Sequence, residues 1–210
     1  MQKSLKIVAI LNVTPDSFSD GGKYFDVEVA VKRGLGMIDS GIDIIDIGGE
    51  STRPGSTRVD AEEEIKRTIP VIKGILAQNP DAVISIDTTK SFVADEALKS
   101  GATIVNDVSG GSFDPEIWKV VANHGAKYIL MHTSGTPDIM QSKTDYIDVV
   151  AEVKDYLFKR AELANMAGVE EIVLDPGIGF GKTAEQNVLL IKNISEFTAN
   201  GHEVLIGLSR

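Results

Sequence analysis

The sequence contains no cysteine among its 210 residues, which excludes disulfide bonds and thiolate-bound zinc and fits a reducing compartment. It has no apolar run near the roughly 18 residues that a membrane-spanning helix needs. The first twelve residues show no signal-peptide pattern. There is no excess of positive charge either: the formal net charge is -10, whereas nucleic-acid-binding domains usually present a basic face. We therefore expect a cytoplasmic protein, with residues 1–210 as one domain, that binds neither membranes nor nucleic acids.

What the sequence does contain is a regular alternation of apolar runs and amphipathic segments. Apolar runs typical of buried parallel strands lie at 5–12, 42–48, 82–87, 102–106, 127–132, 171–175 and 203–208. Helical periodicity lies between them, at 26–40, 60–78, 88–100, 115–124, 144–168 and 183–200. Such alternation predicts an α/β fold with a parallel sheet and right-handed crossovers.

Nearly every one of these apolar runs ends at a polar residue. An open doubly wound sheet binds its ligand at one switch point, whereas a closed barrel recruits residues from many strand ends. We therefore predict a TIM (β/α)8 barrel. The sequence supplies seven strands and six helices and stops directly after a strand, so we expect that the last βα unit is missing from this chain.

Four of these strand-end residues are candidate ligand-binding groups: Asn12, Asp87, Asn106 and Asp175. Taken singly, such a residue is more simply the cap of the following helix or turn. Taken together, carboxylates and amides on rigid strand ends would supply the fixed acceptors and donors that the edge of a heterocycle requires.

Three loops carry further candidates. Residues 12–22 form an unusually long connection for a βα unit. In residues 48–55, paired glycines permit close backbone approach, and Thr52 and Arg53 offer donors to an anionic oxygen. Residues 175–183 are glycine-rich, but they fail the phosphate-loop pattern because Pro176 stands where glycine is required. Phe180 in that loop is a candidate stacking group.

The three histidines are too scattered to predict a metal cluster. His132, at the end of the fifth predicted strand, is interpreted as a hydrogen-bonded structural residue rather than a general base.

Together these segments resemble the dihydropteroate synthases of the folate pathway. The resemblance is collinear, covers essentially the whole chain, and is carried by ILNVTPDSFSDGG (10–22), IIDIGGESTRPG (44–55), ISIDTTKSFVADEAL (84–98), GATIVNDVSGG (101–111), LMHTSGTP (130–137), DPGIGFGKTAEQN (175–187) and LIGLSR (205–210). It implies a TIM barrel that joins 4-aminobenzoate to 6-hydroxymethyl-7,8-dihydropterin diphosphate and releases diphosphate with the help of Mg²⁺. It also implies a homodimer for the full-length protein.

The resemblance further implies roles for individual residues. Asn12 matches the family's Mg²⁺ and diphosphate position, and an amide oxygen suits that hard cation. Asp87, Asn106 and Asp175 match the residues that hold the pterin ring. The remaining implied substrate contacts are Thr52, Arg53, Pro54, Met131, Phe180 and Ser209.

The sequence departs from the family pattern at its end. The family usually continues after Ser209-Arg210 with Lys and Ser and later has an Arg-x-His motif, none of which is present. Two other functions therefore stay open. One is a methyltetrahydrofolate–corrinoid methyltransferase, although that enzyme has no need for the loops at 12–22 and 48–55. The other is a non-catalytic pterin-binding module.

Overall fold

The computed structural model describes residues 5–14, 27–51, 58–135, 140 and 143–207. The strands are β1 (Val8–Asn12), β2 (Ile44–Gly48), β3 (Ile84–Asp87), β4 (Ile104–Asp107), β5 (Lys127–Met131), β6 (Glu171–Asp175) and β7 (Glu203–Val204). The helices are α1 (Val27–Asp39), α2 (Ala61–Gln78), α3 (Ser91–Lys99), α4 (Glu116–His124), α5 (Val149–Met166) and α6 (Ala184–Lys192), followed by a 3₁₀ helix, η3 (Ile194–Thr198).

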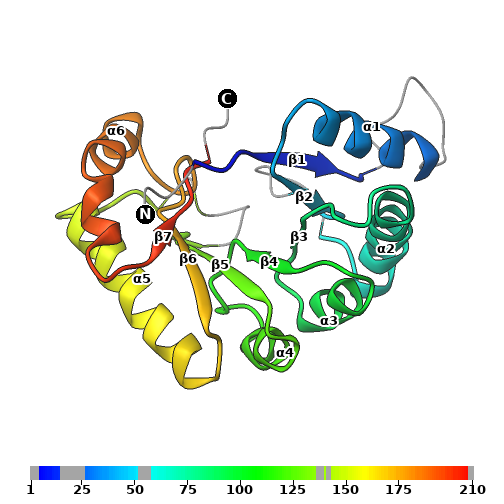
Figure 1. Ribbon diagram of the computed structural model, residues 1–210. Helices are drawn as coiled ribbons and strands as arrows, with labels where there is room; N and C mark the ends of the chain where they lie inside the picture. Colours follow the sequence, from blue (N-terminus) through cyan, green and yellow to red (C-terminus); the bar gives the residue numbers. More distant parts are fainter. Residues whose placement is uncertain (1–4, 15–26, 52–57, 136–139, 141–142, 208–210) are drawn as a thin grey trace.

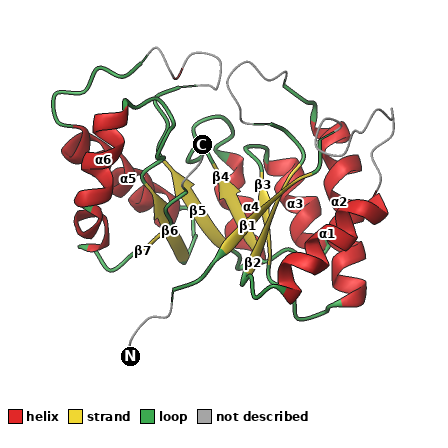
Figure 2. Ribbon diagram, turned by 90° about the horizontal axis from the view of Figure 1, so that it is seen from above, coloured by secondary structure: helices red, strands yellow, loops and turns green. Residues whose placement is uncertain are grey.

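The strands form one parallel sheet whose spatial order follows the chain, from β1 to β7. Figure 1 shows this sheet curling into a half-barrel, with the α-helices on its convex side. Seen from above in Figure 2, α5 and α6 lie on one side of the strands and α1, α2 and α3 on the other. The predicted α/β class, parallel pairing and strand–helix alternation are confirmed.

Local sequence explains where several helices begin. Asp60 caps α2, its side chain accepting a hydrogen bond from the backbone N–H of Glu63 at 2.8 Å. Thr183 and Gln186 form a reciprocal capping box at the start of α6. These caps fix where each helix leaves the carboxyl end of the preceding strand, which is the end that carries the site.

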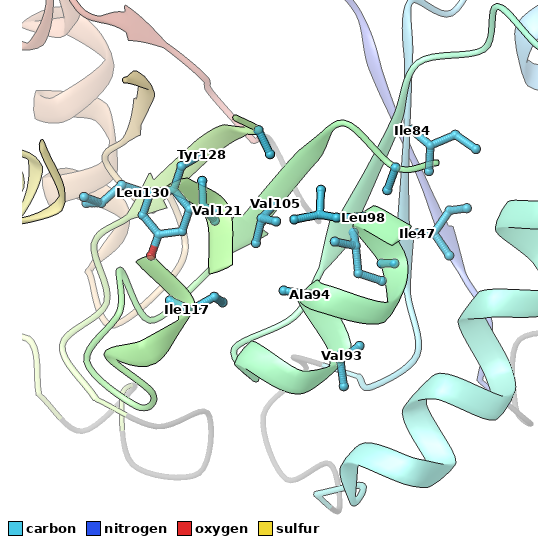
Figure 3. Close-up of a cluster of buried hydrophobic side chains, with 14 of the residues drawn as sticks. Ile47, Ile84, Val93, Ala94, Leu98, Val105, Ile117, Val121, Tyr128 and Leu130 are labelled. Carbon is cyan, nitrogen blue, oxygen red and sulfur yellow. The ribbon is translucent and has the colours of Figure 1, made fainter. Parts of the chain in front are cut away.

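Strand alternation divides the apolar residues between two cores. Side chains on the convex face, such as Ile47, Ile84 and Val105, pack against the helices in the main core, part of which is drawn in Figure 3. A second, smaller cluster lies on the concave face and consists of Ile44, Ile104, Ile129 and Val173. This inner cluster is small and precedes the last residues of the strands, so polar groups occupy the concave face at the carboxyl ends of the strands.

The seventh strand is shorter than predicted. We expected residues 203–208; among residues 203–207, the part of this range that the structure describes, only Glu203 and Val204 are in strand conformation. In the described part of the chain β7 pairs with β6 alone, at two positions, so it lacks a second neighbour to extend the ladder. In the described segments, no helix is both long and apolar enough to cross a bilayer.

Candidate active site at the strand ends

The concave face brings the predicted strand-end residues together: Asn12, Asp87 and Asn106 form one registered row, and Asp175 lies on the same face, two residues further towards the carboxyl ends of the strands. The parallel register places Asn12 beside Gly48, Gly48 beside Asp87, and Asp87 beside Asn106. Further along the sheet, Met131 lies beside Asp175. Because registered neighbours in a parallel sheet face the same side, residues spread over more than 160 sequence positions share one surface.

Gly48 leaves a gap between two oxygen donors. A Cβ at this position would lie 3.5 Å from Asn12 Oδ1 and 3.4 Å from Asp87 Oδ2. An amide oxygen and a carboxylate oxygen therefore flank the same open space. These are the hard oxygen ligands that Mg²⁺ accepts while it keeps several water molecules and substrate phosphates, so the donor set fits the predicted ion.

Beneath this row lies a carboxylate that was not predicted as a site residue. Asp46 in β2 is 4% exposed, and its Oδ2 accepts a hydrogen bond of 2.8 Å from Asn106 Nδ2. Burial raises the pKa of Asp46 above its usual range. Its partner lies 60 residues away and two strands across, so no local sequence pattern indicates the contact.

Asp87 is not the cap of the next helix. Lys90 holds the N-cap position of α3 without a side-chain hydrogen bond, and Thr88 Oγ1 accepts the Lys90 N–H. Burial, followed by the charge of Asp46, raises the pKa of Asp87 well above the ordinary aspartate value. Asp87 thus binds a proton more readily than a surface aspartate does.

The capping interpretation holds for the residue after Asn106 instead. Asp107 accepts hydrogen bonds from the backbone N–H groups of Ser109 and Gly111 and from the Tyr128 hydroxyl. The chain therefore divides the tasks: Asp107 organises the loop on the convex side, while Asn106 faces the concave side.

The loop after β6 contains a buried lysine side chain. Lys182 is 5% exposed; its Nζ lies 3.0 Å from His132 Nδ1 and donates to the Gly177 carbonyl at 2.9 Å. Burial lowers the pKa of Lys182 to about 7. Burial, with the nearby Lys182 charge, also lowers the pKa of His132 to about 3, so His132 is a neutral structural partner, as interpreted.

Asp175 is the last residue of β6 and lies beside Met131 on the concave face. Its Oδ1 accepts the Gly177 N–H at 2.7 Å. Burial raises its pKa to about 6, although the Gly177 hydrogen bond and the Lys182 charge oppose the rise. At pH 7 the group is therefore mostly an anion, although a buried one, and can accept N–H bonds from a ligand.

A partly buried ion cluster anchors the loop that follows β2. Lys90 Nζ lies 2.5 Å from Glu50 Oε2 and 2.6 Å from Glu64 Oε2. Glu50 also accepts the Val59 N–H at 3.3 Å, so its carboxylate ties together both described ends of the loop. A narrow pocket lies here, lined in part by Asp87, Arg58 and Lys90. A second, more open hollow lies along α5 and contains none of the strand-end residues.

The remaining predicted site residues are placed as follows. Met131 is buried at the end of β5, and Phe180 is half-buried in the loop after β6. Thr52, Arg53, Pro54 and Ser209 lie outside the described residues.

Comparison with known proteins was made against this geometry. Residues 8–210 match the family described as pterin binding enzyme. A dihydropteroate synthase from Synechocystis is 49% identical over 99% of this chain and 72% of its own length.

Two solved structures from Xanthomonas albilineans are similar as well. The dihydropteroate synthase with 4-aminobenzoic acid is 43% identical, with a TM-score of 0.89, and the complex with 7,8-dihydropteroate is 40% identical, with a TM-score of 0.85. Each match covers 97% of this chain and 72% of the other. The chain belongs to the pterin-binding enzyme family, and within it to the dihydropteroate synthases.

Proposed function

We propose that this protein catalyses the condensation of 6-hydroxymethyl-7,8-dihydropterin diphosphate with 4-aminobenzoate, giving 7,8-dihydropteroate and diphosphate in folate biosynthesis. The observation that carries the proposal is the single concave surface that carries Asn12, Asp87 and Asn106 in one row and Asp175 at the end of β6. The relatives that share the fold include a dihydropteroate synthase crystallised with 4-aminobenzoic acid and one crystallised with 7,8-dihydropteroate.

The row suits a flat, donor-rich heterocycle. Asp175 is mostly ionised near neutral pH and would accept two N–H bonds from the 2-amino and N3 edge of the pterin. Asp87 and Asn106 would hold the rest of the ring edge, and the buried Met131 would pack on its face. These residues stand on strands rather than on loops, which fixes the ring in one orientation.

The second substrate and the leaving group would lie beyond the pterin. Phe180 and Pro54 would form the apolar wall for the benzoate ring, and Thr52, Arg53 and Ser209 would contact the substrates. Asn12 would hold Mg²⁺ through its amide oxygen, beside the gap at Gly48. When bound, the ion would supply positive charge to the departing diphosphate.

The reaction needs little proton transfer in its bond-breaking step. The arylamine of 4-aminobenzoate is neutral at pH 7 and attacks the methylene carbon next to the pterin, while the C–O bond to diphosphate breaks. The amine proton is lost after the C–N bond forms. The chain contributes mainly by holding the amine in line with the carbon and by stabilising the departing charge.

We further propose that the half-barrel is the greater part of a TIM barrel. Its curvature and sequential strand order support this, as does Ile10, which lies on the concave side of β1 and is 60% exposed. An eighth strand between β1 and β7 would cover it. A homodimer and a cytoplasmic location also stay proposals, drawn from the family resemblance and the absence of cysteine.

One experiment separates this function from the two alternatives. The protein is mixed with the pterin diphosphate, 4-aminobenzoate and Mg²⁺, and diphosphate and dihydropteroate are quantified. Release of both products in equal amounts supports the synthase. Pterin binding without turnover supports the non-catalytic module. In a parallel mixture with methyltetrahydrofolate and cobalamin, methyl transfer to cobalamin supports the methyltransferase.

A further inference from the structure

We infer that Asp46 is a positioning residue that fixes the amide orientation of Asn106 and thereby determines which hydrogen-bonding groups the pterin site accepts. The inference rests on the proposed pterin-binding role of Asn106 and deepens it. Asp46 does not line the outer row; it lies one layer below, at the level of Ser85 on the neighbouring strand.

The location of Asp46 is costly for a carboxylate. It stands between Ile45 and Ile47 in β2 and is 4% exposed. In the described part of the chain no ion pair reaches it, its polar side-chain neighbours are Ser85 and Asn106, and its buried Oδ1 atom makes no well-formed hydrogen bond. An apolar side chain would serve the core better, because burying an unsatisfied polar atom is unfavourable. A carboxylate kept at such a position points to a role outside stability.

The contact to Asn106 supplies that role. Asn106 Nδ2 donates to Asp46 Oδ2 at 2.8 Å, and the small Ser85 on the intervening strand lets this bond pass over β3. Because Asp46 Oδ2 accepts this bond, the NH₂ end of the Asn106 amide faces the carboxyl group. The carbonyl oxygen of Asn106 is then the end left to a ligand.

A fixed amide gives the site its polarity. With the Asn106 carbonyl and the Asp175 carboxylate both acting as acceptors, the site selects a ligand edge that presents N–H groups. If the amide turned over, a donor would face a donor. Losing one such bond to a buried ligand lowers affinity by roughly 10- to 100-fold.

The test exchanges the two side chains. D46N lets the amide at position 106 adopt either orientation, and N106D places a second carboxylate against Asp46. The double variant D46N/N106D restores one donor and one acceptor between the strands and leaves a carboxylate oxygen towards the ligand. D43N is the matched control, since Asp43 is an exposed aspartate that directly precedes the first residue of β2, at the amino end of the strand.

Binding of 6-hydroxymethyl-7,8-dihydropterin diphosphate is measured by calorimetry, and the KM for 4-aminobenzoate is measured separately. Each single variant should weaken pterin binding roughly 10- to 100-fold while the KM for 4-aminobenzoate changes little. The double variant should regain most of the affinity, and D43N should bind as the parent does. Parent-like pterin binding by D46N, or a double variant no better than the weaker single variant, would overturn the inference.

A second measurement does not depend on the ligand. The side-chain NH₂ signal of Asn106, assigned by its loss in N106D, should exchange slowly with water in the parent and faster in D46N. Equal exchange in both proteins would refute the positioning role even if neither binds pterin. Failure of the parent to bind pterin would instead contradict the proposed function, so the two failures are distinguishable.

Discussion

Gly177 offers a quantitative test of the geometry around Asp175. Its φ of +68° lies in the left-handed region, which costs an L-residue about 1–2 kcal/mol. A Cβ there would also lie 2.0 Å from the backbone carbonyl oxygen of His132. Backbone atoms cannot yield as a flexible side chain does, so the overlap adds about 1–3 kcal/mol. We therefore expect G177A to lower the free energy of unfolding by about 2–5 kcal/mol.

Gly179, two residues later, provides the matched control. Its φ of +85° is also left-handed, but an added Cβ would meet no atom within 4 Å. G179A should therefore lose only the conformational part, about 1–2 kcal/mol. Gly36 in α1 has neither restriction, and G36A should be neutral or stabilising by up to about 1 kcal/mol.

The assay is urea unfolding followed by circular dichroism. With a slope of about 2 kcal/mol per molar urea, G177A should lower the midpoint by about 1–2.5 M, and G179A by less than about 1 M. Pterin affinity should fall with G177A as well, because the Gly177 N–H holds Asp175 Oδ1. Equal midpoints for G177A and G179A would refute the close contact between the β5 and β6 loops.

Three further predictions concern charged groups and the proposed Mg²⁺ ligand. N12A should raise the Mg²⁺ concentration required for activity and the KM for the pterin diphosphate by roughly tenfold or more. It should change the Kd of 6-hydroxymethyl-7,8-dihydropterin, which lacks the diphosphate, very little. An equal loss of affinity for both ligands would count against a metal-binding role of Asn12. K90M should destabilise the protein by about 3 kcal/mol, because it leaves the buried Glu64 without its cation. The control K99M, at an exposed lysine, should cost no more than about 1 kcal/mol. Similar urea midpoints for the two variants would argue against a stabilising ion pair between Lys90 and Glu64. Folding raises the pKa of Asp175 from 3.8 to about 6, so the protonated group stabilises the folded protein at low pH, and this contribution of roughly 3 kcal/mol is lost as the pH rises from about 4 to about 6. The free energy of unfolding of the parent, relative to that of D175N, should therefore fall over this interval and level off above it. A difference that does not change with pH would contradict the pKa shift.

Much of this fold could be predicted because it depends on local patterns. Continuous apolar runs mark strands buried on both faces, and the capping residue Asp60 marks the start of α2. Since parallel strands end on the same edge of the sheet, the proximity of Asp87 and Asn106 followed from their positions at the ends of such runs. Strand ends without a second neighbour are harder to predict, as the short β7 shows.

The contacts of Asp46 with Asn106 and of Lys182 with His132 could not be predicted from the sequence. Asp46 meets Asn106 only because β3 carries a small residue between them, which depends on the register of three strands. Lys182 is buried against His132, 50 residues away, although lysine in a glycine-rich loop is usually solvated. In both cases the partner of the polar residue lies on another βα unit, so no local sequence pattern identifies it.

The claim that the concave strand ends bind the pterin is tested most directly by calorimetry of 6-hydroxymethyl-7,8-dihydropterin diphosphate against D175A and E171Q. Glu171 lies on the same strand as Asp175 and at its opposite end. D175A should show no measurable binding heat, and E171Q should bind like the parent. Parent-like affinity in D175A would mean that the pterin binds elsewhere.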